Sequence, residues 1–223
     1  MRETALTTML DKLLHKLSAL PFSNMAKGSS DVILRDRLQF DIDVNGNTSL
    51  VYGRIDLSDY VSIVQNKGLA IKEVRFQLRA PSYGLGNWPS VMLDPHVSAS
   101  FTSNLKVFAT TTAYEVVTDV GIASPNVLCV MEKETTVYVP DATIPAADRT
   151  PSLWVEDRWF GTPDLHPDGY DVVTDLLIGI SLANCDLEAL QESTCELDVM
   201  LIAEPKKITQ RDMTQMLTQA QDL

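Results

Sequence analysis

The chain has 223 residues, of which 45% are apolar, and it carries a formal net charge of −12 at pH 7. This length can bury the core of one all-β domain, and this apolar content excludes a chain that is disordered throughout. The acidic balance disfavours nonspecific binding to nucleic-acid phosphates, because proteins that bind them carry basic patches.

The first part of the chain predicts an amphipathic helix over residues 1–22, followed by a polar linker over residues 23–30. Its leucines recur at intervals of three or four residues, and Pro21 ends the pattern. Such a helix packs on its own domain or on a neighbouring subunit, and the alternative is contact with a membrane surface. We expect four leucines of this stripe to contact a second subunit: Leu6, Leu10, Leu13 and Leu17.

Targeting and cysteine signals are weak. The N-terminus lacks the apolar run and cleavage site of a signal peptide, and the chain has no apolar run of membrane-spanning length. We therefore expect neither a secretory leader nor a transmembrane segment. Cys129, Cys185 and Cys195 are widely spaced and form no CxxC pair, so we expect buried thiols in a reduced protein.

Residues 38–57 predict two strands joined by a tight turn. Apolar and polar residues alternate over residues 38–44, which is the period of a half-buried strand. Asn45-Gly46 supplies the positive φ values of a tight turn, and residues 50–57 form the next strand. An Asn-Gly turn most often joins two strands that pair in one sheet.

Residues 58–79 predict a short helix and a third strand. Ser58 can cap the start of a helix and Gly68 can end it, which leaves about two turns. The next strand begins at Ile71. Residues 73–79 then alternate, with the apolar side chains on one face and the charged or amide side chains on the other.

The remaining body is rich in valine and threonine and predicts further short strands between loops marked by Gly and Pro. With no long internal helix, residues 31–205 are expected to be all-β, a jelly-roll β-sandwich of about eight to ten strands rather than a βαβ fold. The further expected strands cover residues 97–101, 105–112, 114–120, 127–131, 135–139, 154–160, 172–183 and 196–203.

Residues 206–223 predict a second amphipathic helix. Thr209 can cap it, Asp212 stands three residues later as in a capping box, and Ile208 can staple onto Met213. The apolar stripe must be buried on the chain's own body or on another subunit. We expect three of its residues to contact a neighbouring subunit: Met213, Met216 and Leu217.

Two acidic motifs match parts of metal sites without completing them. Residues 41–46 match the first half of an EF-hand loop, but position twelve is Tyr52 and not a bidentate acid, so a hairpin with an acidic face is the better interpretation. Asp164, His166 and Asp168 are weak metal candidates in a loop rich in Pro, where Asp also serves turn formation. We expect no metal and no cofactor.

Enzyme signatures are missing from the sequence. It contains no G-x-S-x-G nucleophile elbow and no His-x-His pair. Glu156 and Asp157 fall on opposite faces of one predicted strand, so they cannot flank a single glycosidic bond. We therefore expect that the protein is not an enzyme.

The three tryptophans are candidates for a sugar-stacking platform. Trp154 and Trp159 are five residues apart in one predicted strand and hence on opposite faces, and Trp88 belongs to a separate loop. Core packing is the alternative role for all three. On this basis a carbohydrate-binding β-sandwich module is the second functional hypothesis.

The run from Gly53 to Arg79 resembles the middle of single jelly-roll capsid proteins of small icosahedral viruses. Those proteins have a strand, a short helix and a strand of the type "Y-x-I-K-x-V-x-x-x-F/L", which is matched here from Gly68 to Leu78 by GLAIKEVRFQL. The resemblance covers about an eighth of the chain strongly, and the rest of the β-body only by strand count.

This resemblance implies a self-assembling coat subunit in a virion, with copies of itself and other virion proteins as partners. Capsid proteins of this kind usually begin with an Arg/Lys-rich arm, whereas this chain begins with an amphipathic helix. We therefore expect no direct genome neutralisation by a basic arm. The first two strands of a jelly roll belong to opposite sheets, which conflicts with the usual role of an Asn-Gly turn.

Overall fold

The computed structural model describes residues 30–94, 100–139, 143, 145, 152–160 and 168–219. The chain divides into two units, Met1–Ser30 and Asp31–Leu223. The predicted helix of residues 1–22 lies outside the described residues, and so does the predicted linker up to residue 29.

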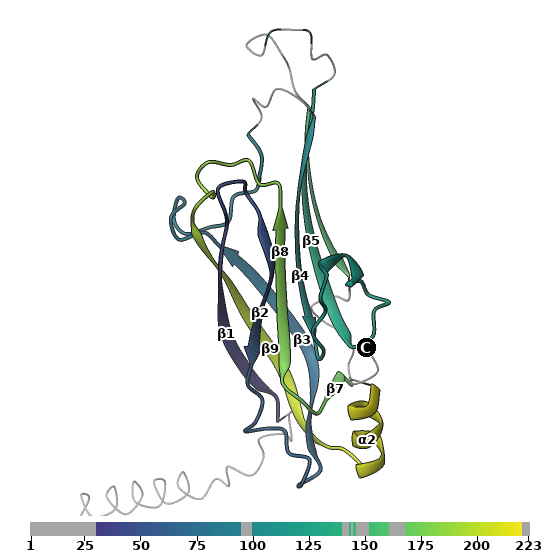
Figure 1. Ribbon diagram of the computed structural model, residues 1–223. Coiled ribbons are helices and arrows are strands. Elements are labelled where there is room, and N and C mark those ends of the chain that lie inside the picture. Colours follow the sequence, from purple (N-terminus) through teal and green to yellow (C-terminus); the bar gives the residue numbers. More distant parts are fainter. Residues whose placement is uncertain are drawn as a thin grey trace, which may run out of the picture. The chain divides into compact units, whose positions relative to one another are not determined.

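The second unit is an all-β sandwich, as the sequence predicts. Its described residues form nine strands in two antiparallel sheets (Figure 1). The four-stranded sheet has the order β1-β9-β3-β7, and the five-stranded sheet has the order β2-β8-β4-β5-β6. The strands are β1 (Val32–Asp41), β2 (Thr48–Ile55), β3 (Lys67–Arg79), β4 (Phe101–Thr110), β5 (Val127–Tyr138), β6 (Ser152–Phe160), β7 (Tyr170–Val172), β8 (Leu176–Ala183) and β9 (Thr194–Lys207).

The strand pairings are nested like those of one long antiparallel hairpin that has been rolled up. β4 pairs with β5, β3 with β7, β2 with β8, and β1 with β9. Rolling also brings β9 beside β3 and β8 beside β4, which completes the two sheets. β6 is added beside β5, outside the nested set, and forms one margin of the five-stranded sheet.

The core lies between the sheets and follows the two-residue period of their strands. In β9, every second residue from Cys195 to Ala203 is buried, and in β8 the same holds from Leu176 to Leu182. Burying one such Leu, Ile or Val side chain stabilises the fold by about 1.5–3 kcal/mol. The alternation along each strand therefore decides which face of each sheet turns inward.

The Asn45-Gly46 turn is a corner between the two sheets and not a hairpin within one. β1 before it pairs with β9, whereas β2 after it pairs with β8. The Asp43 carboxylate accepts the N–H groups of Asn45 at 2.9 Å and Asn47 at 2.7 Å. The Gly46 carbonyl accepts the N–H of Cys185 at 2.9 Å. These bonds tie the turn to itself and to the β8–β9 connection, so no hairpin ladder starts there.

The short helix predicted to start at residue 58 is wrong. Two backbone N–H groups donate to the Leu57 carbonyl in a single turn, and Ser62 and Lys67 then bond to each other through both backbone groups at 2.9 Å. β3 begins at Lys67, inside the expected helix. Residues 61–64 contain three β-branched residues, which lose side-chain freedom in a helix, and this lowers the helix propensity of the segment.

The strand predicted over residues 114–120 is also wrong. This segment contains turns and the 3-10 helix η2 (Val117–Asp119). Its apolar side chains contact Phe108 on the outer face of the five-stranded sheet instead of pairing with a strand. Elsewhere two predicted short strands form one long strand, as residues 127–131 and 135–139 do in β5.

Helix α2 (Gln210–Gln219) follows β9 and lies against its own domain (Figure 1). The Thr209 hydroxyl accepts the Asp212 N–H at 3.2 Å, which is one of the two contacts of a capping box, and it donates to the Asp212 carboxylate at 2.7 Å. Met213 is buried with Ile208 and Val173. Within the described ranges, no helix has the length and apolarity needed to cross a membrane.

All three cysteines are buried and unpaired as thiols. Burial raises the pKa of Cys129 to about 12, and it also raises the pKa values of Cys185 and Cys195. Since the thiolate is the reactive form, we expect the folded protein at pH 8 to resist iodoacetamide, with all three thiols reacting once urea unfolds the chain. Rapid labelling of Cys129 in the folded protein would contradict this.

Because burial raises the pKa of Cys129, the free energy of unfolding is expected to depend on pH. The folded-state pKa of Cys129 lies above the ordinary value of 9.0, so above that pH the unfolded chain loses the proton first. Stability is therefore expected to fall as the pH rises from about 9 towards about 12. Urea unfolding of Cys129→Ala should show a weaker fall over this interval than the natural chain.

Candidate functional site

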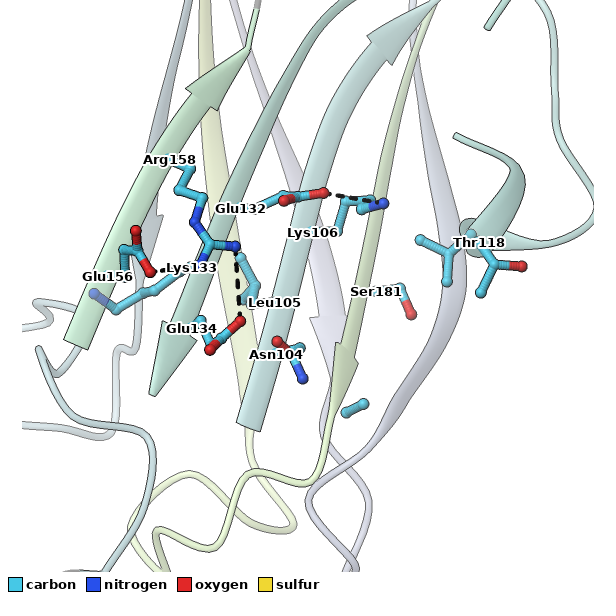
Figure 2. Close-up of a pocket in the computed structure, with 12 residues that line it drawn as sticks. Asn104, Leu105, Lys106, Thr118, Glu132, Lys133, Glu134, Glu156, Arg158 and Ser181 are labelled. Atoms are coloured by element: carbon cyan, nitrogen blue, oxygen red, sulfur yellow. Dashed lines mark hydrogen bonds and ion pairs between the residues drawn. The ribbon is translucent and has the colours of Figure 1, made fainter. Parts of the chain in front are cut away.

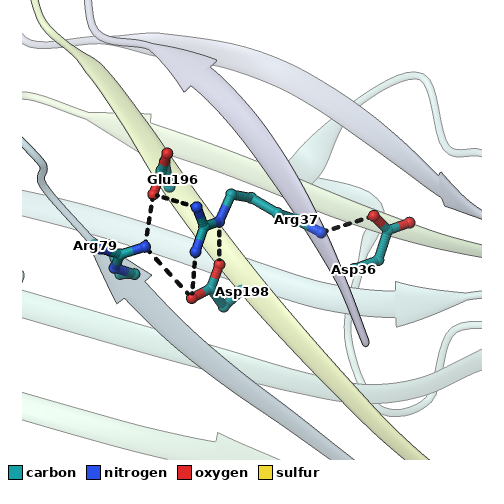
Figure 3. A network of polar contacts seen from close by, with 5 residues as sticks. All are labelled: Asp36, Arg37, Arg79, Glu196 and Asp198. Carbon is teal, nitrogen blue, oxygen red and sulfur yellow. Dashed lines mark hydrogen bonds and ion pairs between the residues drawn. The ribbon is translucent and has the colours of Figure 1, made fainter. Parts of the chain in front are cut away.

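The outer face of the four-stranded sheet carries a closed network of charges (Figure 3). Arg37 of β1 contacts Asp198 at 2.5 Å and Glu196 at 3.3 Å, both on β9. Arg79 of β3 contacts Glu196 at 3.0 Å and Asp198 at 3.8 Å. The hydrogen bond from Arg37 lowers the pKa of Asp198. Because these contacts connect β1, β9 and β3, we assign the network to holding the three strands in register.

The outer face of the five-stranded sheet carries a second set of charges (Figure 2). Lys106 of β4 contacts Glu132 of β5 at 3.1 Å. Arg158 of β6 contacts Glu156 at 2.5 Å and Glu134 of β5 at 3.7 Å. The hydrogen bond from Arg158 and its positive charge lower the pKa of Glu156, and the same pair raises the pKa of Arg158. β6 thus presents an acid and a base on one face.

A recess of about 270 Å³ lies among these charged side chains. Val117 and Thr118 of η2 form part of its wall. The Lys106 ammonium donates to the Val120 carbonyl at 3.0 Å, which ties this segment to the sheet. Each cationic side chain that lines the recess, Lys106, Lys133 and Arg158, has a carboxylate partner, so the recess is a polar surface of matched charges.

The free margin of β6 is the most exposed apolar feature of this sheet. One side of β6 pairs with β5, and no strand in the described part of the chain pairs with its other side. Leu153, Trp154 and Val155 are 42%, 56% and 42% exposed. An unpaired strand that carries consecutive exposed apolar residues is a template for pairing with another chain. We call the free side of Ser152–Phe160 the β6 edge.

Lys133 supports β6 from the neighbouring strand. It is 8% exposed, and its Nζ lies 2.8 Å from Oδ1 of Asp157, the residue directly opposite in β6. A buried ammonium is costly without a partner, and Asp157 supplies that partner. The charge of Asp157 is therefore matched within its own chain, although its side chain is 59% exposed.

The residues predicted to contact a second subunit fall into two groups. Met213 is 2% exposed within its own chain, and Met216 and Leu217 are half-buried against the same cluster. Contact between these residues and a neighbouring subunit stays a prediction. The other predicted contact residues lie outside the described residues: Leu6, Leu10, Leu13 and Leu17.

Of the three weak metal candidates, one lies within the described residues. Asp164 and His166 lie outside the described residues, and Asp168 is described and exposed. Among the described residues, no group of three or more His, Cys, Asp or Glu side chains has a geometry that could hold a metal ion.

The two described tryptophan side chains have different surroundings. Trp88 packs at the margin of the core with its ring centroid 6.2 Å from that of Phe40. Trp154 is exposed beside Tyr138, with ring centroids 6.3 Å apart. The side chain of Trp159 lies outside the described part. Trp154 and Tyr138 are thus the aromatic pair that a ligand could reach.

Sequence reasoning missed the β6 edge. Residues 154–160 were expected to form a strand, but nothing in their pattern says which strand lies beside them. The available signal was the run Leu153-Trp154-Val155, because three consecutive apolar residues in a strand place apolar side chains on both faces. In a central strand both faces can be covered, whereas at a margin they stay exposed.

Comparisons with known proteins identify no family. No family model matches the chain, and no curated protein sequence matches it. Among solved structures, the crystal structure of the Acinetobacter baumannii phage AM24 tailspike protein aligns with 79% of this chain and 28% of its own, at 12% identity and a TM-score of 0.17. This chain thus spans less than a third of that tailspike chain, and a TM-score of 0.17 does not indicate a shared fold.

Proposed function

We propose that this chain is a structural subunit that assembles with copies of itself, as a jelly-roll coat protein of an icosahedral viral shell. The observation that carries the proposal is the nested pairing of β4 with β5, β3 with β7, β2 with β8 and β1 with β9. Eight strands paired in this way in two sheets correspond to two Greek keys. Viral capsid domains use this architecture, but lectins and cupins use it as well, so the surface must decide between them.

The surface favours assembly over catalysis. The charges on both outer faces are matched across strands, as between Arg37 and Asp198 or between Lys106 and Glu132. The β6 edge instead exposes apolar side chains and backbone groups that pair with no strand among the described residues, and another protein chain would satisfy both. The resemblance of the strand sequence from Gly68 to Leu78 to coat proteins of small icosahedral viruses supports the same conclusion, although the short helix of that comparison is not formed.

Purified full-length protein is the material for the test. We expect it to form closed particles or defined oligomers, visible by electron microscopy and by light scattering. Other virion proteins are further partners in this proposal, and the virion is its location. A single monomer mass across a range of salt concentration and pH would contradict it.

The N-terminal segment gives a separate prediction. Deleting residues 1–20 is expected to abolish or strongly reduce particle formation, because their apolar stripe is proposed to lie between subunits. The melting temperature of the β-domain should stay the same, since the sandwich core lies within Asp31–Leu223. Electron microscopy and thermal unfolding measure the two effects.

A matched pair of substitutions controls for the deletion. Leu10→Asp places a charge in the apolar stripe, whereas Lys12→Asp places the same residue off the stripe. We expect Leu10→Asp to impair assembly and Lys12→Asp to leave it intact. Equal assembly of both variants and of the deletion would remove this segment from the proposal.

A carbohydrate-binding module is the second candidate, favoured by the exposed ring pair of Trp154 and Tyr138. Aromatic faces stack on sugar rings, and these two centroids are 6.3 Å apart. Binding on a glycan array that is lost in Trp154→Ala and kept in Trp88→Ala would support this function. No binding to any glycan by the natural chain would exclude it.

A further inference from the structure

We propose that the β6 edge pairs antiparallel with the β6 edge of a second copy of this chain, about a two-fold axis that passes between the two Asp157 residues. The inference deepens the proposed function and rests on it in one respect, because the partner is taken to be another copy of the same chain. It joins the two five-stranded sheets into one continuous sheet.

β6 is the margin least protected against such pairing. The other margin of its sheet, β2, carries a register irregularity between Thr48 and Val51, and such irregularities disturb edge pairing. In the other sheet, β7 has three residues. The margin β1 has three charged residues in succession at its centre, as β6 does, but it lacks the consecutive exposed apolar residues of β6. β6 has nine residues in regular register with β5 from end to end.

The residue types along β6 are complementary to themselves in this register. With Asp157 on the axis, Glu156 of each copy stands opposite Arg158 of the other, which gives two opposite-charge pairs. Val155 stands opposite Trp159, and Trp154 stands opposite Phe160, so apolar residues face apolar residues. Two of the three exposed apolar residues, Trp154 and Val155, then lie beside apolar residues of the second copy.

The two Asp157 residues would face each other as like charges, and the positive charge of Lys133 offsets their repulsion. Each Asp157 carboxylate already lies 2.8 Å from the buried Lys133 ammonium of its own chain. The centre of the contact therefore holds two ion pairs and not two bare carboxylates.

Other symmetric registers fit less well. A two-fold axis normal to the sheet pairs residues whose side chains lie on the same face of the joined sheet. Each symmetric register therefore has one residue that lies on the axis and pairs with the same residue of the other copy. With Glu156 there, two glutamates face each other and Val155 faces Asp157. With Arg158 there, two arginines face each other and Glu156 faces Phe160. The register centred on Asp157 is the one that matches both charge and apolarity.

Two charge reversals test the contact. In Glu156→Arg the strand has arginine at both positions 156 and 158, and in Arg158→Glu it has glutamate at both, so each variant alone brings like charges together. We expect each to weaken self-association by about tenfold, measured by sedimentation equilibrium at low salt. Both side chains are exposed, and thermal unfolding checks that each variant folds.

Mixing the two variants separates the contact between copies from the pair within one chain. In the mixed dimer every arginine faces a glutamate of the other copy, whereas the pair between residues 156 and 158 stays broken inside both chains. We expect the equimolar mixture to recover the association of the natural chain. Weak association of the mixture, or unchanged association of either single variant, would overturn the β6 contact.

The same measurements distinguish this inference from the proposed function. Natural protein that stops at a dimer, is weakened by each reversal and is restored by mixing would keep the β6 contact and contradict the coat protein. Particles that form equally well in both variants would overturn the β6 contact and leave the coat protein standing. Natural protein that stays monomeric at all concentrations would contradict both.

Discussion

Replacing Gly46 by alanine is expected to lower the free energy of unfolding by about 3–5 kcal/mol, or to prevent folding. Gly46 has a φ of +74°, which an L side chain adopts only with strain. A Cβ at this position would lie 1.7 Å from the carbonyl oxygen of Cys185, which is backbone and cannot rotate away. The corner would have to separate from the β8–β9 connection, with loss of the Cys185 N–H bond to the Gly46 carbonyl.

Gly84→Ala is the matched control for this substitution. Gly84 also has a positive φ of +53°, but nothing lies within 4 Å of the Cβ that alanine would add. This variant therefore measures the backbone strain alone, about 1 kcal/mol. Urea unfolding of both variants gives the difference due to the collision with Cys185. Equal losses in the two variants would show that the corner can move away from the connection.

At this corner the turn could be predicted from the sequence, but the sheets that it connects could not. Asn45-Gly46 correctly indicates a turn with a positive φ, because only a few residue types accept that conformation. Whether such a turn joins strands in one sheet or in two depends on where the flanking strands pair. That choice is made by β9 and β8, more than a hundred residues later in the chain.

Strand positions could be predicted where one face is buried and the other is exposed. The alternation from Val74 to Arg79 appears in the structure as expected, because each apolar side chain there turns towards the core. The errors at residues 58–67 and 114–120 have a common cause. Both segments meet the rest of the domain through turns and side-chain contacts that no local pattern encodes.

The candidate surface was less predictable than the fold. Glu156 and Asp157 were correctly expected on opposite faces of one strand, and their partners are Arg158 on one face and Lys133 on the other. The identity of those partners depends on the pairing of β5 with β6, which local patterns leave open. An edge strand and a central strand can carry the same sequence, so the exposure of Trp154 follows from topology and not from composition.

Gly179→Ala is expected to destabilise the domain by about 3 kcal/mol through overpacking. Gly179 lies in β8 directly opposite Phe108 of β4, and the ring of Phe108 covers it. A Cβ on residue 179 would lie 2.2 Å from the tip of that ring. Phe108 is fully buried and meets Tyr52 edge-on, with ring centroids 5.8 Å apart, so the ring has nowhere to move.

A double substitution tests this cause directly. Phe108→Leu alone removes part of the ring and is expected to cost about 1–2 kcal/mol through the space it leaves. In the presence of Gly179→Ala that space receives the added methyl group, so the double variant should be more stable than Gly179→Ala alone. The two losses measured by urea unfolding should therefore not add. Additive losses would mean that the strain lies in the backbone of β8, and that the ring of Phe108 is not what makes glycine necessary at position 179.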